Sequence, residues 1–353
     1  MVSAADSTAQ PAAERLLAAA LAGRPAHAYL FHGPRGVGKR TAARAFAGDL
    51  LGDRRRVAAG THPDLRVVEA LGDMIRIDAI RALHHDLHLR PFEGDRRVYL
   101  LLDAHLLNDD AADALLKDLE EPPAYATLVL VADTLGPIPD TIRSRCQLVP
   151  FRPLPEQAVR AWVDAQESGL GEDEVRAITR SASGRLDRAA RLLDGGARAR
   201  RAALLEVARS AYRGEGFDPA VGATVVAHAS AAAGAEAGER EKTTVAALDL
   251  STREAEQRVR RATRGAERDE LLAALGELES WFRDLVVVSA GAEGAVVNAD
   301  RLAELREDAP RAAAGAAAAA EAVREAWRVA EELNVNSSLW VEALFVQVKR
   351  AFG

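Results

Sequence analysis

The sequence predicts an α/β domain built on a parallel sheet, followed by a small helical domain and a larger all-helical domain. Short apolar runs alternate with helical stretches up to about Pro155, whereas the pattern from Glu156 onward is helical and becomes rich in alanine after Ala197. Parallel strands that are covered by helices on both faces are typically short, continuous apolar runs. We therefore expect three domains, at residues 1–152, 153–196 and 197–353.

The elements of the first domain follow from its apolar runs. The predicted strands are residues 27–32, 65–69, 98–103, 128–132 and 147–151. Pro150, Pro153 and Pro155 mark the end of this domain, because proline interrupts regular pairing and restrains its neighbours.

The two later domains are predicted to be helical throughout. In the last helix an apolar stripe at helical spacing is formed by Leu339, Trp340, Ala343, Leu344 and Val348. Two alanine-rich stretches, residues 230–241 and 312–320, are expected to be exposed helix or mobile connection. Alanine favours a helix but offers little side chain to bury.

Composition narrows the class of protein. The chain is 48% hydrophobic and 28% charged, and 46 Lys and Arg against 53 Asp and Glu give a formal charge of -7. This balance argues against a protein that coats nucleic acid. Without a long apolar run or a secretory signal, we expect a cytoplasmic protein with no membrane segment. The single cysteine, Cys146, excludes an intramolecular disulfide and a multi-cysteine metal site.

A glycine-rich loop predicts a nucleotide site. Residues 33–39 (GPRGVGK) lie between a predicted strand and a predicted helix at 41–51. In this context glycines let backbone N–H groups face an anion, and the lysine reaches the β and γ phosphates. The candidate nucleotide-binding residues of this degenerate site are Gly33, Gly36, Gly38, Lys39, Arg40, Thr41 and Asp103.

Two features of a hydrolytic site are degraded. Arg40 follows Lys39 where a Mg²⁺-binding loop has Ser or Thr, and Thr41 comes one residue late, about 100° around the helix. Asp103 ends a predicted strand alone, where an ATPase has two adjacent acids. It is a candidate nucleotide-site residue, although a helix-capping carboxylate is the alternative. ATP or ADP binding therefore stays open, and hydrolysis is in doubt.

Two further motifs carry a family resemblance. Residues 111–123 (AADALLKDLEEPP) and 141–146 (TIRSRC) resemble the AAA+ subunits of bacterial sliding-clamp loaders, and among these the delta-prime subunits of DNA polymerase III. The resemblance implies a P-loop AAA+ domain, a helical lid and a helical collar that assembles with other subunits. By position it implies that Arg145 is an arginine finger acting in trans on a neighbour's ATP. A surface arginine paired with a carboxylate is the alternative.

The departures from the family's ATPases also carry meaning. Asp187 stands where the lid of an ATPase subunit often has a sensor arginine, and Arg188 is one residue late. At the end of the fourth strand Ala132 and Asp133 replace the usual Ser, Thr or Asn sensor. The family's four-cysteine zinc module is missing, so we expect no zinc. Residues 279–285 and 333–344 resemble the collar more loosely.

Taken together, the resemblance implies a stator subunit that does not hydrolyse ATP. Its implied partners are the ATPase motor subunits and a delta-type subunit, with the sliding clamp and primed DNA reached through the assembled complex. The alternative is a catalytically active AAA+ ATPase such as the motor subunit of the same loader, and a P-loop kinase is more distant.

Other charged clusters are given structural roles. His84, His85 and His88 have spacing suited to a metal ion, but no carboxylate motif lies near them in sequence, so we expect no metal there. The arginines at 198–201 and 258–264 are interpreted as solvated helix faces. Neither cluster contains an aromatic residue, so any DNA contact is expected to be with backbone phosphates.

Overall fold

The computed structural model describes residues 9–70, 74–214, 216–246, 251–332 and 337–353. The chain forms two compact units. The N-terminal unit is Met1–Ala158 with Gly184–Asp187, and the C-terminal unit is Val159–Ser183 with Arg188–Gly353. The division into three domains stays a prediction. None of the described helices is long and apolar enough to cross a membrane.

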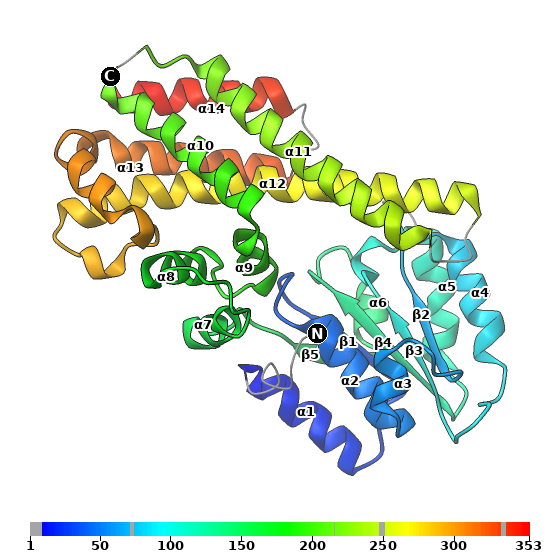
Figure 1. Cartoon of the computed structure of the whole chain (residues 1–353). Helices are drawn as coiled ribbons and strands as arrows, with labels where there is room; N and C mark the ends of the chain where they lie inside the picture. The colour runs from blue at the N-terminus through cyan, green and yellow to red at the C-terminus, as the bar shows by residue number, and fades with distance from the viewer. Residues whose placement is uncertain (1–8, 71–73, 215, 247–250, 333–336) are drawn as a thin grey trace. The chain divides into compact units, whose positions relative to one another are not determined.

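A five-stranded sheet forms the centre of the N-terminal unit (Figure 1). All of its pairings are parallel, in the order β2-β3-β4-β1-β5. The strands are β1 (Ala28–His32), β2 (Leu65–Val68), β3 (Arg97–Leu101), β4 (Ala126–Ala132) and β5 (Gln147–Pro150). Each predicted strand is therefore confirmed to within two residues at either end.

Helices cover both faces of this sheet, which explains why its strands are continuously apolar. One layer contains α1 (Pro11–Ala22), α2 (Lys39–Leu51) and α3 (Arg54–Ala58), and the other contains α4 (Ile77–Leu87), α5 (Asp109–Glu120) and α6 (Asp140–Arg143). The 3₁₀ turn η2 (Ala104–Leu106) follows β3. Successive strand residues point to opposite faces. Tyr29 and Phe31 therefore pack against Phe46 of α2, whereas Leu30 joins the core on the α4 and α5 side.

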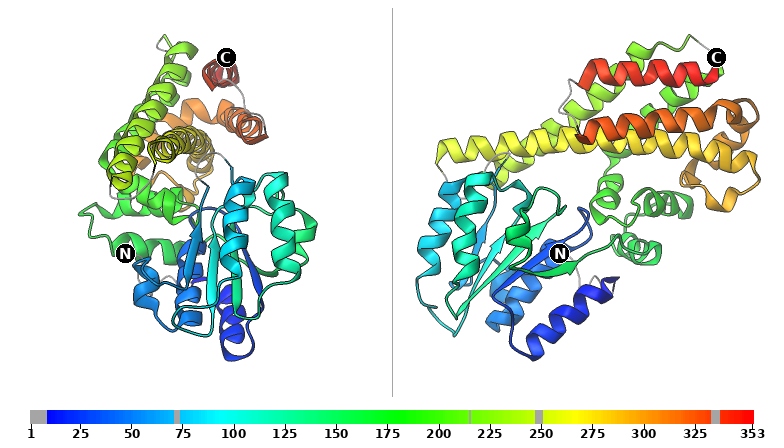
Figure 2. Two further views of the ribbon diagram at one scale, coloured as in Figure 1. Left: turned by 90° about the vertical axis from the view of Figure 1, so that its right-hand side faces the viewer. Right: turned by 180° about the vertical axis from the view of Figure 1, so that it is seen from behind.

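The described part of the C-terminal unit is helical. Its elements are α7 (Glu156–Asp164), α8 (Glu172–Ser181), α9 (Leu186–Leu193), α10 (Gly195–Arg213), α11 (Pro219–Val245), α12 (Thr252–Ser289), η3 (Glu293–Ala295), η4 (Ala299–Arg301), α13 (Leu302–Glu332) and α14 (Ser337–Phe352). The first residues of α7 and of α9 belong to the N-terminal unit. Helix α12 packs against α11 and α13, and α14 packs against the same two helices (Figure 2). The core is centred on Trp281, Phe282 and Phe345, all fully buried.

The alanine-rich stretches are helical, which agrees with one of the two expected alternatives, but each helix is exposed on one side only. Four alanines of α13 are buried in the core: Ala312, Ala316, Ala319 and Ala320. In α11, Ala233 is buried as well. Small side chains let two helices approach each other closely. An alanine is therefore buried in the core wherever another helix packs directly against it. At Gly315 a Cβ atom would lie 2.3 Å from the backbone oxygen of Ala351.

The predicted stripe of the last helix is only partly correct. Leu344 and Val348 are buried, but Leu339 is 71% exposed and Ala343 is also exposed. The buried face of α14 is completed instead by Val341 and Phe345. Of the looser collar resemblance, residues 333–336 lie outside the described residues.

The arginines of α10 are not all on a solvated face, which corrects the sequence interpretation. Arg201 is 7% exposed and its guanidinium contacts Asp300 at 2.6 Å and Asn298 at 2.7 Å. Arg200 pairs with Glu270 of α12. In the second cluster Arg258 pairs with Glu241 of α11. A buried guanidinium needs such partners because desolvation of an unpaired charge is costly.

The contact at Gly315 predicts that a single methyl group added there lowers the stability of the fold. We expect Gly315→Ala to lower the free energy of unfolding by about 1–3 kcal/mol, because the methyl group meets backbone that cannot move aside. The matched control is Gly265→Ala in α12, where a Cβ would meet nothing within 4 Å. This control should raise stability by about 0.5–1 kcal/mol through helix propensity. Urea unfolding followed by circular dichroism measures both, and equal stabilities would contradict the prediction.

Candidate functional site

The topology of the sheet brings the predicted nucleotide-site residues together. In parallel strands the carboxyl ends meet at one edge, and β3, β4 and β1 are adjacent. Asp103 lies just beyond β3, Asp133 follows β4, and the glycine-rich loop follows β1 and leads into α2 at Lys39. Three segments that are distant in sequence thus supply one site.

Glycine is required where the loop leaves β1 and where it enters α2. Gly33 has φ +140°, and a Cβ there would lie 2.1 Å from the backbone oxygen of Phe151. Gly38, the residue before α2, has φ +94°. Both values lie in the region that side chains disfavour. The loop therefore has the backbone form that the sequence motif predicts.

The lysine of the loop is held by its own chain. Lys39 is 4% exposed, and its Nζ donates to the carbonyl oxygens of Gly33 at 2.7 Å and Pro34 at 2.6 Å. The same nitrogen lies 2.9 Å from Oδ1 of Asp133. Burial lowers the pKa of Lys39, and the carboxylate of Asp133 offsets part of this effect. The Lys39 ammonium is thus already satisfied without a phosphate group.

Arg40 pairs with the single acid that follows β3. One terminal nitrogen of its guanidinium donates to both oxygens of Asp103, at 2.8 and 2.7 Å. Asp103 is mostly buried and has φ +58° at the end of the strand. It stands at the N-cap of η2 but makes no side-chain capping hydrogen bond, so the capping alternative is not what is seen. A guanidinium has only donors and cannot bind Mg²⁺.

A second carboxylate lies against the loop itself. A Cβ placed on Gly36 would be 1.8 Å from Oδ1 of Asp187, so this acid is in close contact with the glycine backbone. The backbone N–H of Leu186 donates to the carbonyl of Gly36 at 2.8 Å and holds the segment in place. Arg185 pairs with Asp187 at 2.7 Å. The residue at the lid sensor position thus presents negative charge where an ATPase would present positive charge.

Two further residues of these motifs are Thr41 and Arg188. Thr41 is exposed, one position beyond Arg40 on α2. Arg188, one residue after Asp187, has its guanidinium carbon 5.5 Å from the ring centre of Trp327. The carboxylates of Asp103, Asp133 and Asp187 therefore already neutralise the cations of the loop.

The predicted finger lies at the end of α6 in a defined orientation. The Arg145 guanidinium donates to the carbonyl of Thr141 at 2.9 Å and to Oε1 of Glu120 at 2.5 Å. Glu120 is the first Glu of the Leu-Glu-Glu-Pro-Pro motif, so the two family motifs contact each other through this pair. The side chains of Arg145 and Glu120 are 34% and 49% exposed. Exposed pairs of this kind contribute about 0–1 kcal/mol and exchange easily.

The neighbours of Arg145 support the turn and have no reactive character. Ser144 donates its hydroxyl to the carbonyl of Thr141 at 3.1 Å. The thiol of Cys146 is buried in the sheet core, and burial raises its pKa to about 12. A thiol with so high a pKa is scarcely ionised near neutral pH and is a poor nucleophile.

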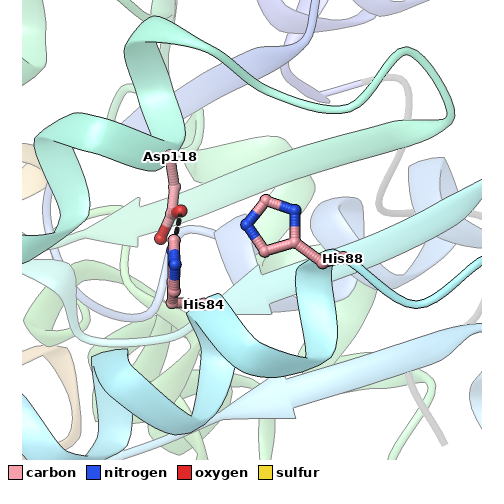
Figure 3. A group of neighbouring side chains, drawn as sticks. All are labelled: His84, His88 and Asp118. Carbon is pink, nitrogen blue, oxygen red and sulfur yellow. Dashed lines mark hydrogen bonds and ion pairs between the residues drawn. The ribbon is translucent and has the colours of Figure 1, made fainter.

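Sequence reasoning missed several contacts because they join distant segments. It did not foresee Glu120 as the partner of Arg145 or Asp133 as the partner of Lys39. It also found no carboxylate for the histidines of α4, yet Asp118 of α5 lies 2.5 Å from Nδ1 of His84 (Figure 3). The motif Leu-Leu-Lys-Asp-Leu contained this residue, but only the packing of α4 on α5 brings it to the histidines.

Comparison with known proteins agrees with the motifs. Residues 9–155 match the family described as "DNA polymerase III, delta subunit". The chain is 34% identical over 148 residues to the delta' subunit of DNA polymerase III from Bacillus subtilis, which is 38% of this chain and 45% of that protein. It is 40% identical over 136 residues to the delta' subunit from Pseudomonas aeruginosa, which is 34% of this chain and 42% of that protein.

The resemblance to delta-prime-like clamp-loader subunits is confirmed. The α/β fold with a parallel sheet and a helical C-terminal region, as predicted, is confirmed with it. The chain is also 32% identical over 185 residues to the tau subunit of DNA polymerase III from Bacillus subtilis, which is 48% of this chain and 33% of that protein. The chain thus spans less than half the length of these relatives.

The contact of Asp187 with the loop predicts weak nucleotide binding that one substitution strengthens. We expect Asp187→Asn to raise the affinity for ATP about three- to tenfold, because a like charge near the phosphates disfavours binding by on the order of 1 kcal/mol. The matched control is Asp78→Asn on α4, which changes the net charge equally at an exposed position. Fluorescence anisotropy of labelled ATP measures each affinity. An unchanged affinity in the Asp187 variant would contradict the prediction.

Proposed function

We propose that this chain is a stator subunit of a sliding-clamp loader that does not hydrolyse ATP and that supplies Arg145 to a neighbouring subunit. The observation that carries the proposal is the pairing of Arg40 with both oxygens of Asp103. Asp103 is the single acid at the end of β3, where ATPases have two adjacent acids, and a guanidinium pairs with it. Without the metal ion the charge that develops on a transferring phosphoryl group is not neutralised.

The position of Arg145 supports a role in trans. Its guanidinium is partly exposed and is held by Thr141 and Glu120, so it is presented at the surface of the N-terminal unit in one orientation. The carboxylate of Glu120 accepts from one terminal nitrogen of Arg145, and phosphate oxygens can replace it as the acceptor. Glu120 therefore keeps the finger oriented in the free chain and releases it at an ATP site.

The proposed partners follow from the family. The chain would assemble with ATPase motor subunits and a delta-type subunit, and it would reach the sliding clamp and primed DNA through that complex. Its own P-loop would hold ATP or ADP weakly, or stay filled by its internal ion pairs. The exposed Leu339 of α14 is available to such an assembly.

A catalytically active AAA+ ATPase is the second candidate. The similarity to the tau subunit and the intact loop glycines with Lys39 favour it. In that case ATP and Mg²⁺ would have to displace Arg40 from Asp103 and Asp133 from Lys39 during each turnover. The two candidates differ in what the chain does by itself.

Hydrolysis by the purified chain separates the two candidates. We expect no ATP turnover above that of the Lys39→Ala variant, because Asp103 is not available to Mg²⁺. Release of phosphate with and without Mg²⁺ measures this. Turnover that requires Mg²⁺ and disappears in Lys39→Ala would favour the ATPase and reject the stator.

The finger is tested in the reconstituted loader. We expect Arg145→Ala to slow the adjacent ATP site by about a thousandfold or more, so the DNA-stimulated turnover of the complex falls. Arg143→Ala is the matched control, because its side chain has the same 34% exposure and lies two residues away. Equal turnover in the two variant complexes, with normal assembly, would remove the finger assignment and leave the stator assignment to the preceding test.

A further inference from the structure

We propose that His84, His88 and Asp118 form a site for one divalent transition-metal ion of the Zn²⁺ class. The three residues lie where α4 packs on α5, and Figure 3 shows both imidazoles beside the carboxylate. One ligand atom from each residue lies within 4.8 Å of the others. This site is separate from the P-loop and from Arg145, so it does not depend on the proposed function.

The two histidines are arranged as a pair by the helix. Residues four apart share one face of an α-helix, and His88 is the C-cap residue of α4. The ring centres are 4.8 Å apart and the rings are nearly perpendicular, at 83°. Both side chains are exposed, so an ion can enter from solvent and keep water in its remaining positions.

Asp118 distinguishes this group from two surface histidines. It is 2% exposed, yet it lies beside His84, whose side chain is half exposed. Its Oδ1 is 2.5 Å from Nδ1 of His84, while Oδ2 is buried and has no hydrogen-bond partner in the described part of the chain. A buried carboxylate oxygen without a partner is unfavourable. A bound cation would compensate this charge where the single imidazole does so only in part.

The donor set selects the class of ion. Two imidazole nitrogens with one carboxylate oxygen suit Zn²⁺ and similar ions, whereas Mg²⁺ prefers oxygen ligands. Metal–nitrogen bonds are about 2.0 Å, so neighbouring ligands lie about 3.3 Å apart in a tetrahedral site. Binding therefore lengthens the contact between His84 and Asp118 and closes the distance to His88. A metal ion on Nδ1 of His84 takes the place of the hydrogen-bonded proton, and the neutral imidazole then carries its proton on Nε2.

The site is tested by titration of the full chain with ZnCl₂ in a calorimeter. We expect one ion per chain in the wild type, and binding at least about tenfold weaker in both His88→Ala and Asp118→Asn. His85→Ala is the matched control, because His85 is exposed on the same helix and is not one of the three ligands. It should bind as the wild type does.

Other outcomes would overturn the proposal. Binding in Asp118→Asn or His88→Ala that equals the wild type would reduce the group to a hydrogen-bonded pair only, and so would an equal loss in His85→Ala. Competition by Mg²⁺ would reject the class of ion. Circular dichroism reports whether each variant folds. If Asp118→Asn does not fold, the test rests on His88→Ala, because His88 is exposed. Visible absorption of Co²⁺ gives a second readout, because a tetrahedral site gives a strong band.

Discussion

A charge that is removed from water needs a partner of opposite sign, and this constraint links the described sites of the chain. In the P-loop Lys39 is almost fully buried and is satisfied by Asp133 and two carbonyl oxygens. In the C-terminal unit Asp308 is fully buried and accepts from Arg209, Arg213 and Tyr212. Asp118 is a buried carboxylate whose second oxygen has no partner within the described residues. The cases differ in the group that neutralises the buried charge, which is a carboxylate for Lys39, two guanidinium groups for Asp308 and an imidazole for Asp118.

The P-loop combines a backbone built for anions with side chains that leave little room for one. The glycines adopt the conformations that the motif requires, and α2 begins at Lys39 as in a phosphate site. Around them, Asp133 pairs with Lys39 and Asp103 pairs with Arg40, while Asp187 contacts Gly36. The loop thus contributes to the fold through ion pairs and hydrogen bonds within the chain.

The sequence was most informative where the pattern depends on local chemistry. Continuous apolar runs predicted each strand, since burial on both faces leaves no polar alternation, and the glycine spacing predicted the loop. It was least informative where two distant segments meet. Arginines on a helix give the same sequence pattern whether they face water or a buried acid. Arg201 contacts Asp300, which is 99 residues away in sequence. The burial of alanines in α13 was not predicted because a small side chain is buried only when another helix comes close. Asp118 and His84 are 34 residues apart, and only tertiary packing unites them.

The ion pair of Arg40 with Asp103 has a consequence for how the protein responds to its surroundings. A metal ion must be drawn from solution, so its occupancy follows the free concentration of that ion. Arg40 is attached to the chain, and its effective concentration at Asp103 is set by the geometry of α2 and β3. The charge balance at this edge of the sheet is then the same whether Mg²⁺ is abundant or chelated. In the stator that we propose, this edge of the sheet would keep the same charge balance whether or not Mg²⁺ is bound elsewhere in the complex.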